Sequence, residues 1–220
     1  MRPAGAIFDL DGTLIDSMYL WDYLPDALVR RFGAAPRPGL SRALREMSTP
    51  QAADYLISVY RLPASPRQLM DALEELSDRE YRETIPIKPG ARELLDQLKG
   101  LGVPCALATA SQTGQARAAL ERLGLAPFFR GIFSTEDWGP KSRPEIYLQA
   151  ARALGTPPKD TLVFEDSLHA ARTAAGAGFQ VAGVYDPFSA EDGEAMGQVC
   201  RWYLPRLDDR AFWEELGIRN

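Results

Sequence analysis

The stretch IFDLDGTLID, from Ile7 to Asp16, decides how the rest of the sequence is interpreted. Its apolar residues are typical of a buried strand, and this strand ends in two aspartates, Asp9 and Asp11, with Gly12 directly behind them. Side chains two positions apart on an extended segment face the same side. The sequence therefore predicts that two carboxylates meet at the mouth of a buried strand.

Beyond this stretch, one long helical segment interrupts an alternation of strands and helices. Residues 17–84 have helical apolar spacing almost throughout, and Ser65 followed by proline is a typical helix start. Later helices are expected at residues 89–100, 115–124, 144–155 and 168–178, and strands at 103–109, 131–135, 161–166 and 180–185. Such alternation predicts a parallel sheet covered by helices on both faces. The expected fold is a doubly wound, Rossmann-like α/β core (residues 1–15 and 87–220) with an inserted all-helical cap (residues 16–86).

Composition argues against several classes of protein. The 220 residues are 45% hydrophobic, enough for a sizeable core, and the net charge of −5 argues against a nucleic-acid or anionic-membrane partner. No apolar run approaches the roughly 20 residues that span a bilayer, and the first aspartate comes too early for a signal peptide. Cys105 and Cys200 lie far apart and favour buried, reduced thiols. A cytoplasmic protein is expected, and its charge balance does not predict an oligomeric state.

Polar residues follow several of the expected strands. In open parallel sheets, ligands bind at the carboxyl ends of the strands, so residues far apart in the sequence reach one rim. The residues expected at this rim are Asp9, Asp11, Thr109, Ser111, Lys141, Glu165 and Asp166.

Several carboxylates at one rim repel one another unless a cation joins them. At about 4 Å, each pair of charges is worth on the order of 4 kcal/mol at an effective dielectric constant near 20. Magnesium prefers such oxygen ligands together with a substrate phosphate, and Lys141 would offset the remaining negative charge. The sequence therefore predicts a rim whose oxygen ligands suit Mg²⁺ together with a phosphate group.

Two simpler interpretations of the first motif are weaker. Asp11-Gly12 is a common hairpin turn, but no matching strand follows it. A calcium loop also begins with aspartate-x-aspartate, but it requires a ligand, a glycine and a glutamate where Thr13, Leu14 and Leu20 stand. Thr109 and Lys141 taken singly would be an ordinary capping hydroxyl and a surface lysine, so the ordered combination carries the prediction.

That combination resembles the haloacid dehalogenase-like hydrolase superfamily over nearly the whole core. FDLDGTLIDS is similar to its first motif, ALATAS to its second, KSRPEIY to its third and VFEDS to its fourth, in the right order. A helical cap after the first motif resembles the subgroup of sugar-phosphate phosphatases, phosphoglycolate phosphatases and β-phosphoglucomutase. Two departures concern loop shape: Ser142 follows Lys141 where proline is usual, and Ala170 replaces a usual glycine.

The resemblance implies phosphoryl transfer through an aspartyl-phosphate. Asp9 is implied as the nucleophile, and Asp11 as the acid that protonates the leaving alcohol and the base that activates water. The phosphoryl group would be held by Thr109, Ala110, Ser111 and Lys141. Magnesium would be held by Asp9, Asp11 (through its backbone carbonyl) and Asp166, with Glu165 in a lesser role.

Alternatives within and outside the family remain. A phosphonoacetaldehyde hydrolase needs a cap lysine, and residues 16–86 contain none. A β-phosphoglucomutase-like mutase carries a histidine where Trp21 stands, and the single histidine, His169, lies in the core, so a phosphatase is favoured. A non-catalytic regulator that binds a phosphorylated metabolite would not need the complete set of motifs. The identity of the substrate is not predicted by the sequence.

Overall fold

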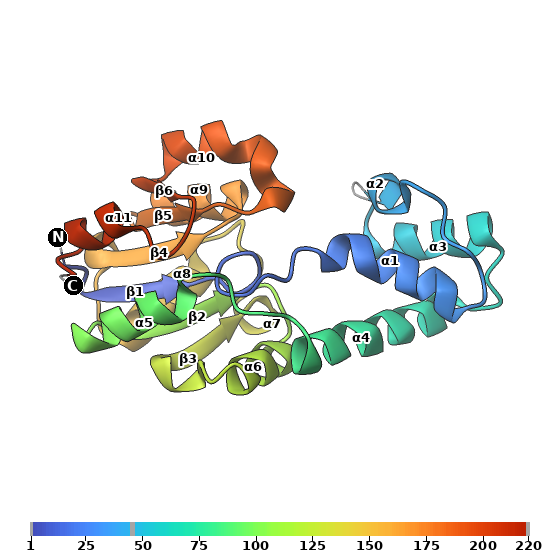
Figure 1. The fold of residues 1–220 in the computed structure, drawn as a ribbon, viewed down its shortest axis with the longest axis horizontal. Helices are drawn as coiled ribbons and strands as arrows, with labels where there is room; N and C mark the ends of the chain where they lie inside the picture. The colour runs from blue at the N-terminus through green and yellow to red at the C-terminus, as the bar shows by residue number, and fades with distance from the viewer. Residues whose placement is uncertain (1, 45–46, 219–220) are drawn as a thin grey trace. The chain divides into compact units, whose positions relative to one another are not determined.

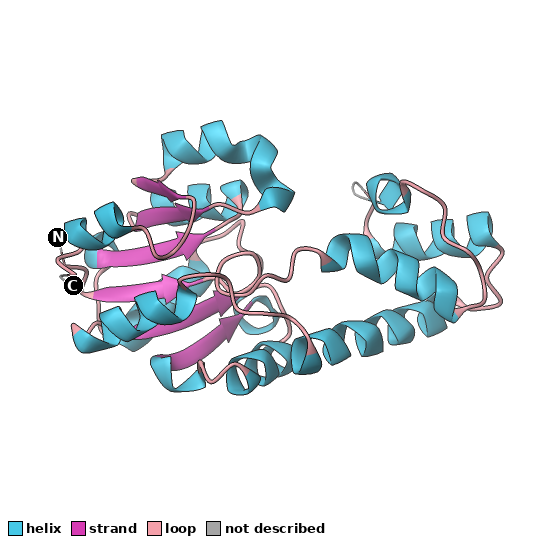
Figure 2. Cartoon of the chain, viewed as in Figure 1, coloured by secondary structure: helices cyan, strands magenta, loops and turns pink. Residues whose placement is uncertain are grey.

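The computed structural model describes residues 2–44 and 47–218. The chain forms two compact units, Met1–Ser17 with Ile85–Asn220 and Met18–Thr84, each of which is described separately. The first unit contains the whole sheet, and the second is helical (Figures 1 and 2).

The first unit is built on a six-stranded parallel sheet in the order β3-β2-β1-β4-β5-β6, so the predicted α/β fold is confirmed. The strands are β1 (Gly5–Phe8), β2 (Cys105–Thr109), β3 (Phe129–Ser134), β4 (Thr161–Glu165), β5 (Gln180–Val184) and β6 (Trp202–Leu204). β3 ends at Ser134 rather than at Thr135. β6 has only three residues, too few for its apolar pattern to predict a strand.

Helices surround this sheet. They are α5 (Ala91–Gly100), α6 (Thr113–Arg122), α7 (Thr135–Trp138), α8 (Glu145–Leu154), α9 (Leu168–Gly176), α10 (Gly193–Val199) and α11 (Arg210–Glu215). Short 3₁₀ turns occupy Ala126–Phe128, Pro158–Asp160 and Pro187–Asp192. Both cysteines are buried and reduced, which agrees with their predicted state.

The two faces of the sheet have different cores. On one face, Ile7 and Val163 pack with Tyr147 of α8 and with small residues of α9. On the other, the rings of Phe8 and Phe164 stack 4.3 Å apart, and Phe212 of α11 meets Phe164 edge-on. The alternation along β1 and β4 therefore sends every second side chain toward α8.

The second unit consists of α1 (Leu20–Arg31), α2 (Leu40–Leu44), α3 (Thr49–Tyr60) and α4 (Pro66–Glu83) around an apolar core. Ser65 caps α4 as its sequence predicts, since its hydroxyl accepts the Gln68 amide and the Gln68 side chain accepts the Ser65 amide. Leu28, Leu56 and Leu76 come from three of these helices and lie in this core.

A buried carboxylate joins the two ends of this helical unit. Glu80 is 6% exposed and accepts hydrogen bonds from the Tyr19 hydroxyl at 3.2 Å and from the Thr84 hydroxyl. Tyr19 precedes α1 and Thr84 follows α4, so the carboxylate ties the first residues of the unit to the last. A buried carboxylate that loses a donor retains its desolvation cost.

Thr84→Val should therefore lower the free energy of unfolding of the helical unit by about 1–2 kcal/mol. The matched control is Ser58→Ala, because the Ser58 hydroxyl is exposed and donates to a neutral backbone carbonyl, that of Tyr55. Urea unfolding followed by circular dichroism measures both variants. An equal, small effect of the two would contradict a stabilising role for the Thr84 hydroxyl.

Within the first unit, the segments that lead into and out of the helical insertion run side by side. Ile15 forms an antiparallel bridge with Ile87, and the Asp16 amide donates to the Pro86 carbonyl at 2.9 Å. The guanidinium of Arg122 in α6 donates to the Ile85 carbonyl. Both segments are therefore fixed to the sheet-bearing unit up to the boundary of the insertion.

Candidate active site

Asp9 and Glu165 continue the sheet face that packs against α8. Asp9 follows Ile7 by two positions, Glu165 follows Val163 by two, and Ile7 and Val163 are paired across β1 and β4. Period-two alternation therefore places both carboxylates on the side of Tyr147. Asp9 is 6% exposed and Glu165 is 0% exposed, so both have lost nearly all their water.

Lys141 lies between these two carboxylates. Its ammonium is 2.5 Å from Asp9 Oδ1 and 2.5 Å from Glu165 Oε1, and its side chain is 7% exposed. A turn at Gly139, whose φ of 78° suits glycine, connects α7 to the loop that carries this lysine. Lys141 lies more than a hundred residues after Asp9 in the sequence, and in the structure it is the direct partner of Asp9.

Tyr147 completes the surroundings of Glu165 and was not predicted as a site residue. Its hydroxyl donates to Glu165 Oε1 at 2.8 Å, and the Ser167 amide donates to Glu165 Oε2 at 3.3 Å. A tyrosine on the apolar face of an expected helix needs a hydrogen-bond partner for its hydroxyl. This need is the signal in the sequence that could have indicated Tyr147. Glu165 is therefore held in one orientation by Lys141, Tyr147 and the backbone.

Asp11 has a different environment from Asp9. It is half-buried, the Ser17 hydroxyl donates to its Oδ1 at 2.7 Å, and the Ser111 hydroxyl donates to its Oδ2. Thr109 is fully buried at the end of β2, and its hydroxyl accepts the Ser111 amide at 3.0 Å. The structure thus brings Ser111 and Asp11 together, and sequence reasoning missed Ser17.

The remaining predicted positions lie at the same carboxyl edge of the sheet. Ala110 follows β2, is exposed, and its carbonyl accepts the Thr135 hydroxyl at 3.3 Å. Asp166 follows β4 and is 5% exposed, and its carbonyl accepts the Ser189 hydroxyl. His169 is exposed on α9, next to Ser167.

Burial governs the electrostatics of this group. Burial raises the pKa of Asp9 well above its usual range, against the opposing charge of Lys141 and with added repulsion from Glu165. Burial likewise raises the pKa of Asp166 to about 7, and the Glu165 charge adds to it. Burial alone would lower the pKa of Lys141, but the charges of Asp9 and Glu165 and its hydrogen bonds to both raise it. Lys141 thus contacts two of the three carboxylates directly, and the charge of Lys88 also acts to lower the pKa of Asp166.

This donor set fits a hard divalent cation. Within the described residues, ligand oxygens of Asp9, Glu165 and Asp166 all lie within 4.8 Å of one another. Burial and the Glu165 charge together raise the pKa of Asp9 and of Asp166, even though the charge of Lys141 opposes both shifts. The Asp11 carboxylate is outside this triad. Carboxylate oxygens are preferred ligands of magnesium, and the cluster is consistent with a metal site.

The raised pKa of Asp166 predicts how the metal-free protein responds to pH. Between the unfolded value of 3.8 and the folded value of about 7, the folded state binds a proton that the unfolded chain releases. The unfolding free energy should therefore fall as pH rises from 5 to 8 in chelator, by up to about 3 kcal/mol, because a shift of roughly three units is only partly titrated within this range.

Urea unfolding at pH 5, 6, 7 and 8 measures this slope. Magnesium favours the ionised carboxylates and should flatten or reverse it, and Asp166→Asn should reduce it in chelator. An unfolding free energy that rises with pH in chelator would contradict this prediction, because it would show that ionisation of the clustered carboxylates does not destabilise the folded state.

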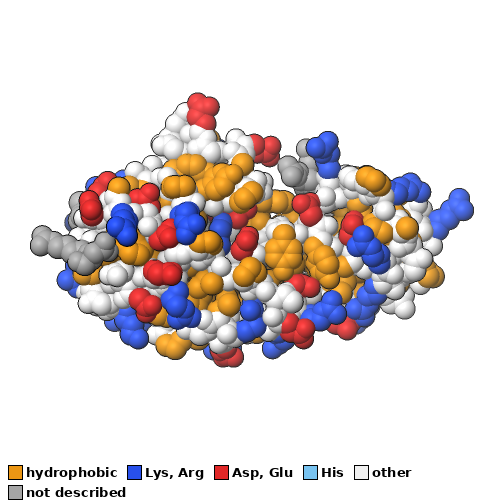
Figure 3. Space-filling model, viewed as in Figure 1, with side chains coloured by type: hydrophobic (Ala, Val, Ile, Leu, Met, Phe, Trp, Pro, Cys, Tyr) orange, Lys and Arg blue, Asp and Glu red, His pale blue; other side chains and the backbone are white. Residues whose placement is uncertain are grey.

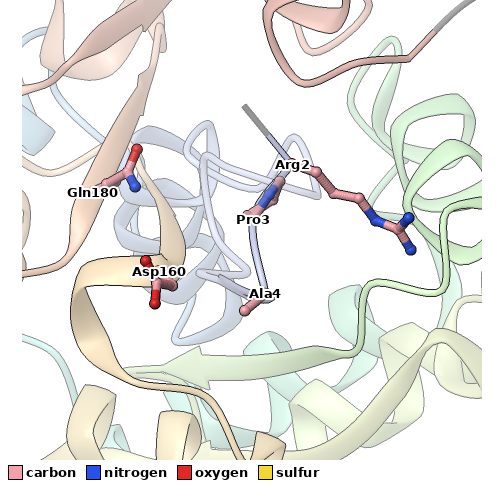
Figure 4. A pocket seen from close by; sticks show the side chains of 5 residues that line it. All are labelled: Arg2, Pro3, Ala4, Asp160 and Gln180. Carbon is pink, nitrogen blue, oxygen red and sulfur yellow. The ribbon is translucent and has the colours of Figure 1, made fainter.

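Other surface features do not share this chemistry. A shallow pocket lined by Arg2, Pro3, Ala4, Asp160 and Gln180 lies at the amino ends of β1, β4 and β5, the opposite edge of the sheet (Figure 4). On the face shown in Figure 3, basic and acidic side chains are interspersed. In the part of the chain that the structure describes, every helix is too short or too polar to cross a membrane.

Comparisons with known proteins agree with the motifs and the fold. A family model described as haloacid dehalogenase-like hydrolase matches residues 3–178. The phosphorylated carbohydrates phosphatase of Thermotoga maritima is 29% identical over 192 residues, which cover 86% of this chain and 88% of that protein. Hexitol phosphatase A of Escherichia coli is 31% identical over 190 residues, which cover 85% of each.

A solved structure gives the same result for the fold. A candidate β-phosphoglucomutase from Thermotoga maritima has a TM-score of 0.87 at 25% identity, covering 98% of this chain and 100% of that one. The likeness extends over both units, so the helical insertion between β1 and β2 is shared as well. The chain belongs to the haloacid dehalogenase-like hydrolase family and is a hydrolase of its phosphatase type.

Proposed function

We propose that the protein is a magnesium-dependent phosphatase that hydrolyses a phosphorylated sugar or sugar alcohol through an aspartyl-phosphate at Asp9. The observation that carries this proposal is the buried contact of Lys141 with both Asp9 and Glu165, with Asp166 beside them. This arrangement combines a buried nucleophile, a fixed cation and a carboxylate site for a metal ion. Each of these parts favours transfer of a dianionic phosphoryl group.

In the first step, a carboxylate oxygen of Asp9 attacks phosphorus. The bond between phosphorus and the ester oxygen breaks, and Asp11 gives its proton to the leaving alcohol. In the second step, Asp11 takes a proton from a water molecule that attacks the aspartyl-phosphate, which releases phosphate and restores Asp9. The Ser17 hydroxyl holds the Asp11 carboxylate in place between the steps.

Other residues bind the phosphoryl oxygens and the metal ion. Lys141, the Thr109 hydroxyl, the Ala110 amide and the Ser111 side chain are proposed to bind the transferring group. Asp9, the Asp11 carbonyl and Asp166 would hold Mg²⁺, with Glu165 mainly orienting Lys141. When bound, Mg²⁺ stabilises negative charge on the phosphoryl oxygens.

The substrate class is proposed from the relatives. One acts, by its name, on phosphorylated carbohydrates and another on hexitol phosphates, and each aligns over about 85% of this chain. Polyol and sugar monophosphates are small, anionic and rich in hydroxyls. The buried ammonium of Lys141 suits the anionic phosphate group of such substrates.

Release of phosphate from p-nitrophenyl phosphate, with magnesium and then with excess chelator, tests the reaction class. A panel of hexitol phosphates, hexose phosphates and phosphoglycolate then tests the substrate class. Metal-dependent release with a preference for a hexitol or hexose phosphate supports the proposal. A folded protein that releases phosphate from none of these compounds with magnesium would contradict it.

A phosphosugar mutase is the second candidate, favoured by the structural likeness to the candidate β-phosphoglucomutase. Trp21 stands where the resemblance implies a histidine in mutases, and its side chain is 63% exposed. Phosphorus NMR of a β-glucose 1-phosphate reaction separates the two activities. Inorganic phosphate identifies a phosphatase, and glucose 6-phosphate identifies a mutase.

A further inference from the structure

Lys88 makes a set of contacts that neither the motifs nor the proposed mechanism uses. Its ammonium donates to the Gly12 carbonyl at 2.6 Å, to Asp186 Oδ2 at 2.7 Å and to the Tyr185 carbonyl at 3.0 Å. The side chains of Lys88 and Asp186 are 12% and 2% exposed. A nearly buried ion pair of this kind is costly unless its remaining hydrogen-bonding capacity is satisfied.

The contacts match the chemistry of lysine. An ammonium has three protons in a tetrahedral arrangement, and here three acceptors receive them. A planar arginine fork would not reach two carbonyls and a carboxylate that converge on one point. Asp186 is itself fixed, because its other oxygen accepts the Phe188 amide at 2.9 Å.

The Gly12 carbonyl belongs to the loop that carries Asp11. Gly12 has a φ of 74°, and its amide donates to the Ile15 carbonyl at 3.0 Å, which closes the loop. Lys88 also holds this loop through its backbone, since its amide donates to the Leu14 carbonyl at 2.9 Å. Lys88 therefore ties the Asp11–Ile15 turn to the end of β5 at Asp186.

We propose that Lys88, held by Asp186, is a positioning residue for the acid/base Asp11. It fixes the Gly12 carbonyl and so the orientation of the chain immediately after Asp11. The kinetic part of this inference rests on the proposed phosphatase mechanism, and the structural part does not. Its consequence is specific: loss of Lys88 impairs proton transfer by Asp11 more than attack by Asp9.

The kinetic test compares two leaving groups in Lys88→Met. A hexitol phosphate releases an alkoxide that needs a proton from Asp11, whereas p-nitrophenolate leaves without one. The variant should lose at least about tenfold in kcat/KM for the alkyl ester and no more than about threefold for the aryl ester. Asp186→Asn keeps an acceptor for Lys88 and should show the same bias with a smaller loss.

Lys159→Met is the matched control, because Lys159 is exposed in the turn before β4 at the opposite edge of the sheet. Lys159→Met should leave kcat/KM unchanged for both the alkyl and the aryl ester. An equal loss for both esters in Lys88→Met would overturn the proposal and leave Lys88 a purely structural residue.

Hydrogen exchange provides a readout that does not depend on activity. Amide exchange in a peptide spanning residues 8–16 should become at least about tenfold faster in Lys88→Met and stay unchanged in Lys159→Met. Unchanged exchange in this peptide would overturn the inference even if the protein is an active phosphatase. Faster exchange in a protein that hydrolyses neither ester would support the positioning contact and refute the proposed function instead.

Discussion

Asp9→Asn should reduce phosphate release by at least about 10⁴-fold with both alkyl and aryl phosphates. The amide cannot form the aspartyl-phosphate, and the neighbouring Glu165 carboxylate is engaged by Lys141 and Tyr147. Steady-state release at saturating magnesium measures the loss. Mass spectrometry of the protein quenched during turnover should detect an added phosphoryl group in the wild type and none in the variant.

The same substitution should not unfold the protein. Asp9 is one of three clustered, buried carboxylates, two of which Lys141 contacts, and burial raises the pKa of Asp9 well above the usual range. Removing this charge relieves repulsion, so the variant should be at least as stable as the wild type in chelator and should gain less stability from magnesium.

Asp160→Asn, in the turn at the opposite sheet edge, is the matched control and should change neither activity nor magnesium response. Substantial residual activity in Asp9→Asn would exclude Asp9 as the nucleophile. If Asp9→Asn loses both activity and folding in chelator, removal of the Asp9 charge does not relieve repulsion in the cluster, and the stability prediction is wrong.

The strand ends were predictable because one physical rule covers them. Parallel strands bring their carboxyl ends to one edge, so apolar runs that end in Asp9, Thr109 and Glu165 predict a shared rim. In the structure, Asp9 directly follows β1, Thr109 ends β2 and Glu165 ends β4, and β1 lies between the other two strands. The motif order then allowed the family to be recognised, which the comparisons confirm.

Contacts between loops were not predictable in the same way. The partners of Asp11 are Ser17 and Ser111, and nothing in their spacing shows that both hydroxyls converge on one carboxylate. The pairing of Lys88 with Asp186 joins residues 98 positions apart in loops that follow no periodic pattern. Such contacts depend on how the loops close over the sheet edge, which local propensity does not encode.

Lys141→Met should have the largest effect on stability. Its ammonium is the cation in direct contact with both Asp9 and Glu165, and all three side chains are at least 90% buried. Breaking a buried pair by removing one partner costs about 3–5 kcal/mol, because the other charges stay buried without compensation. Methionine keeps most of the side-chain volume, so the loss reports charge rather than a cavity.

The pH dependence of this loss identifies its origin. Lys141 stays protonated over the working range because its carboxylate partners raise its pKa, so the wild type keeps its compensating charge. In the variant, the carboxylates can relieve the strain only by binding protons or a cation. The deficit measured by urea unfolding in chelator should therefore be greatest at pH 8, shrink toward pH 5, and shrink at pH 8 when magnesium is added.

Lys159→Met again serves as the control and should unfold like the wild type under all these conditions. A deficit that is the same at pH 5 and pH 8 would show that Lys141 stabilises the fold by packing and not by charge. A deficit that magnesium removes while activity stays low would separate its two roles. Magnesium can then replace the lysine in balancing the carboxylates but cannot replace it in binding the phosphoryl group that Asp9 attacks.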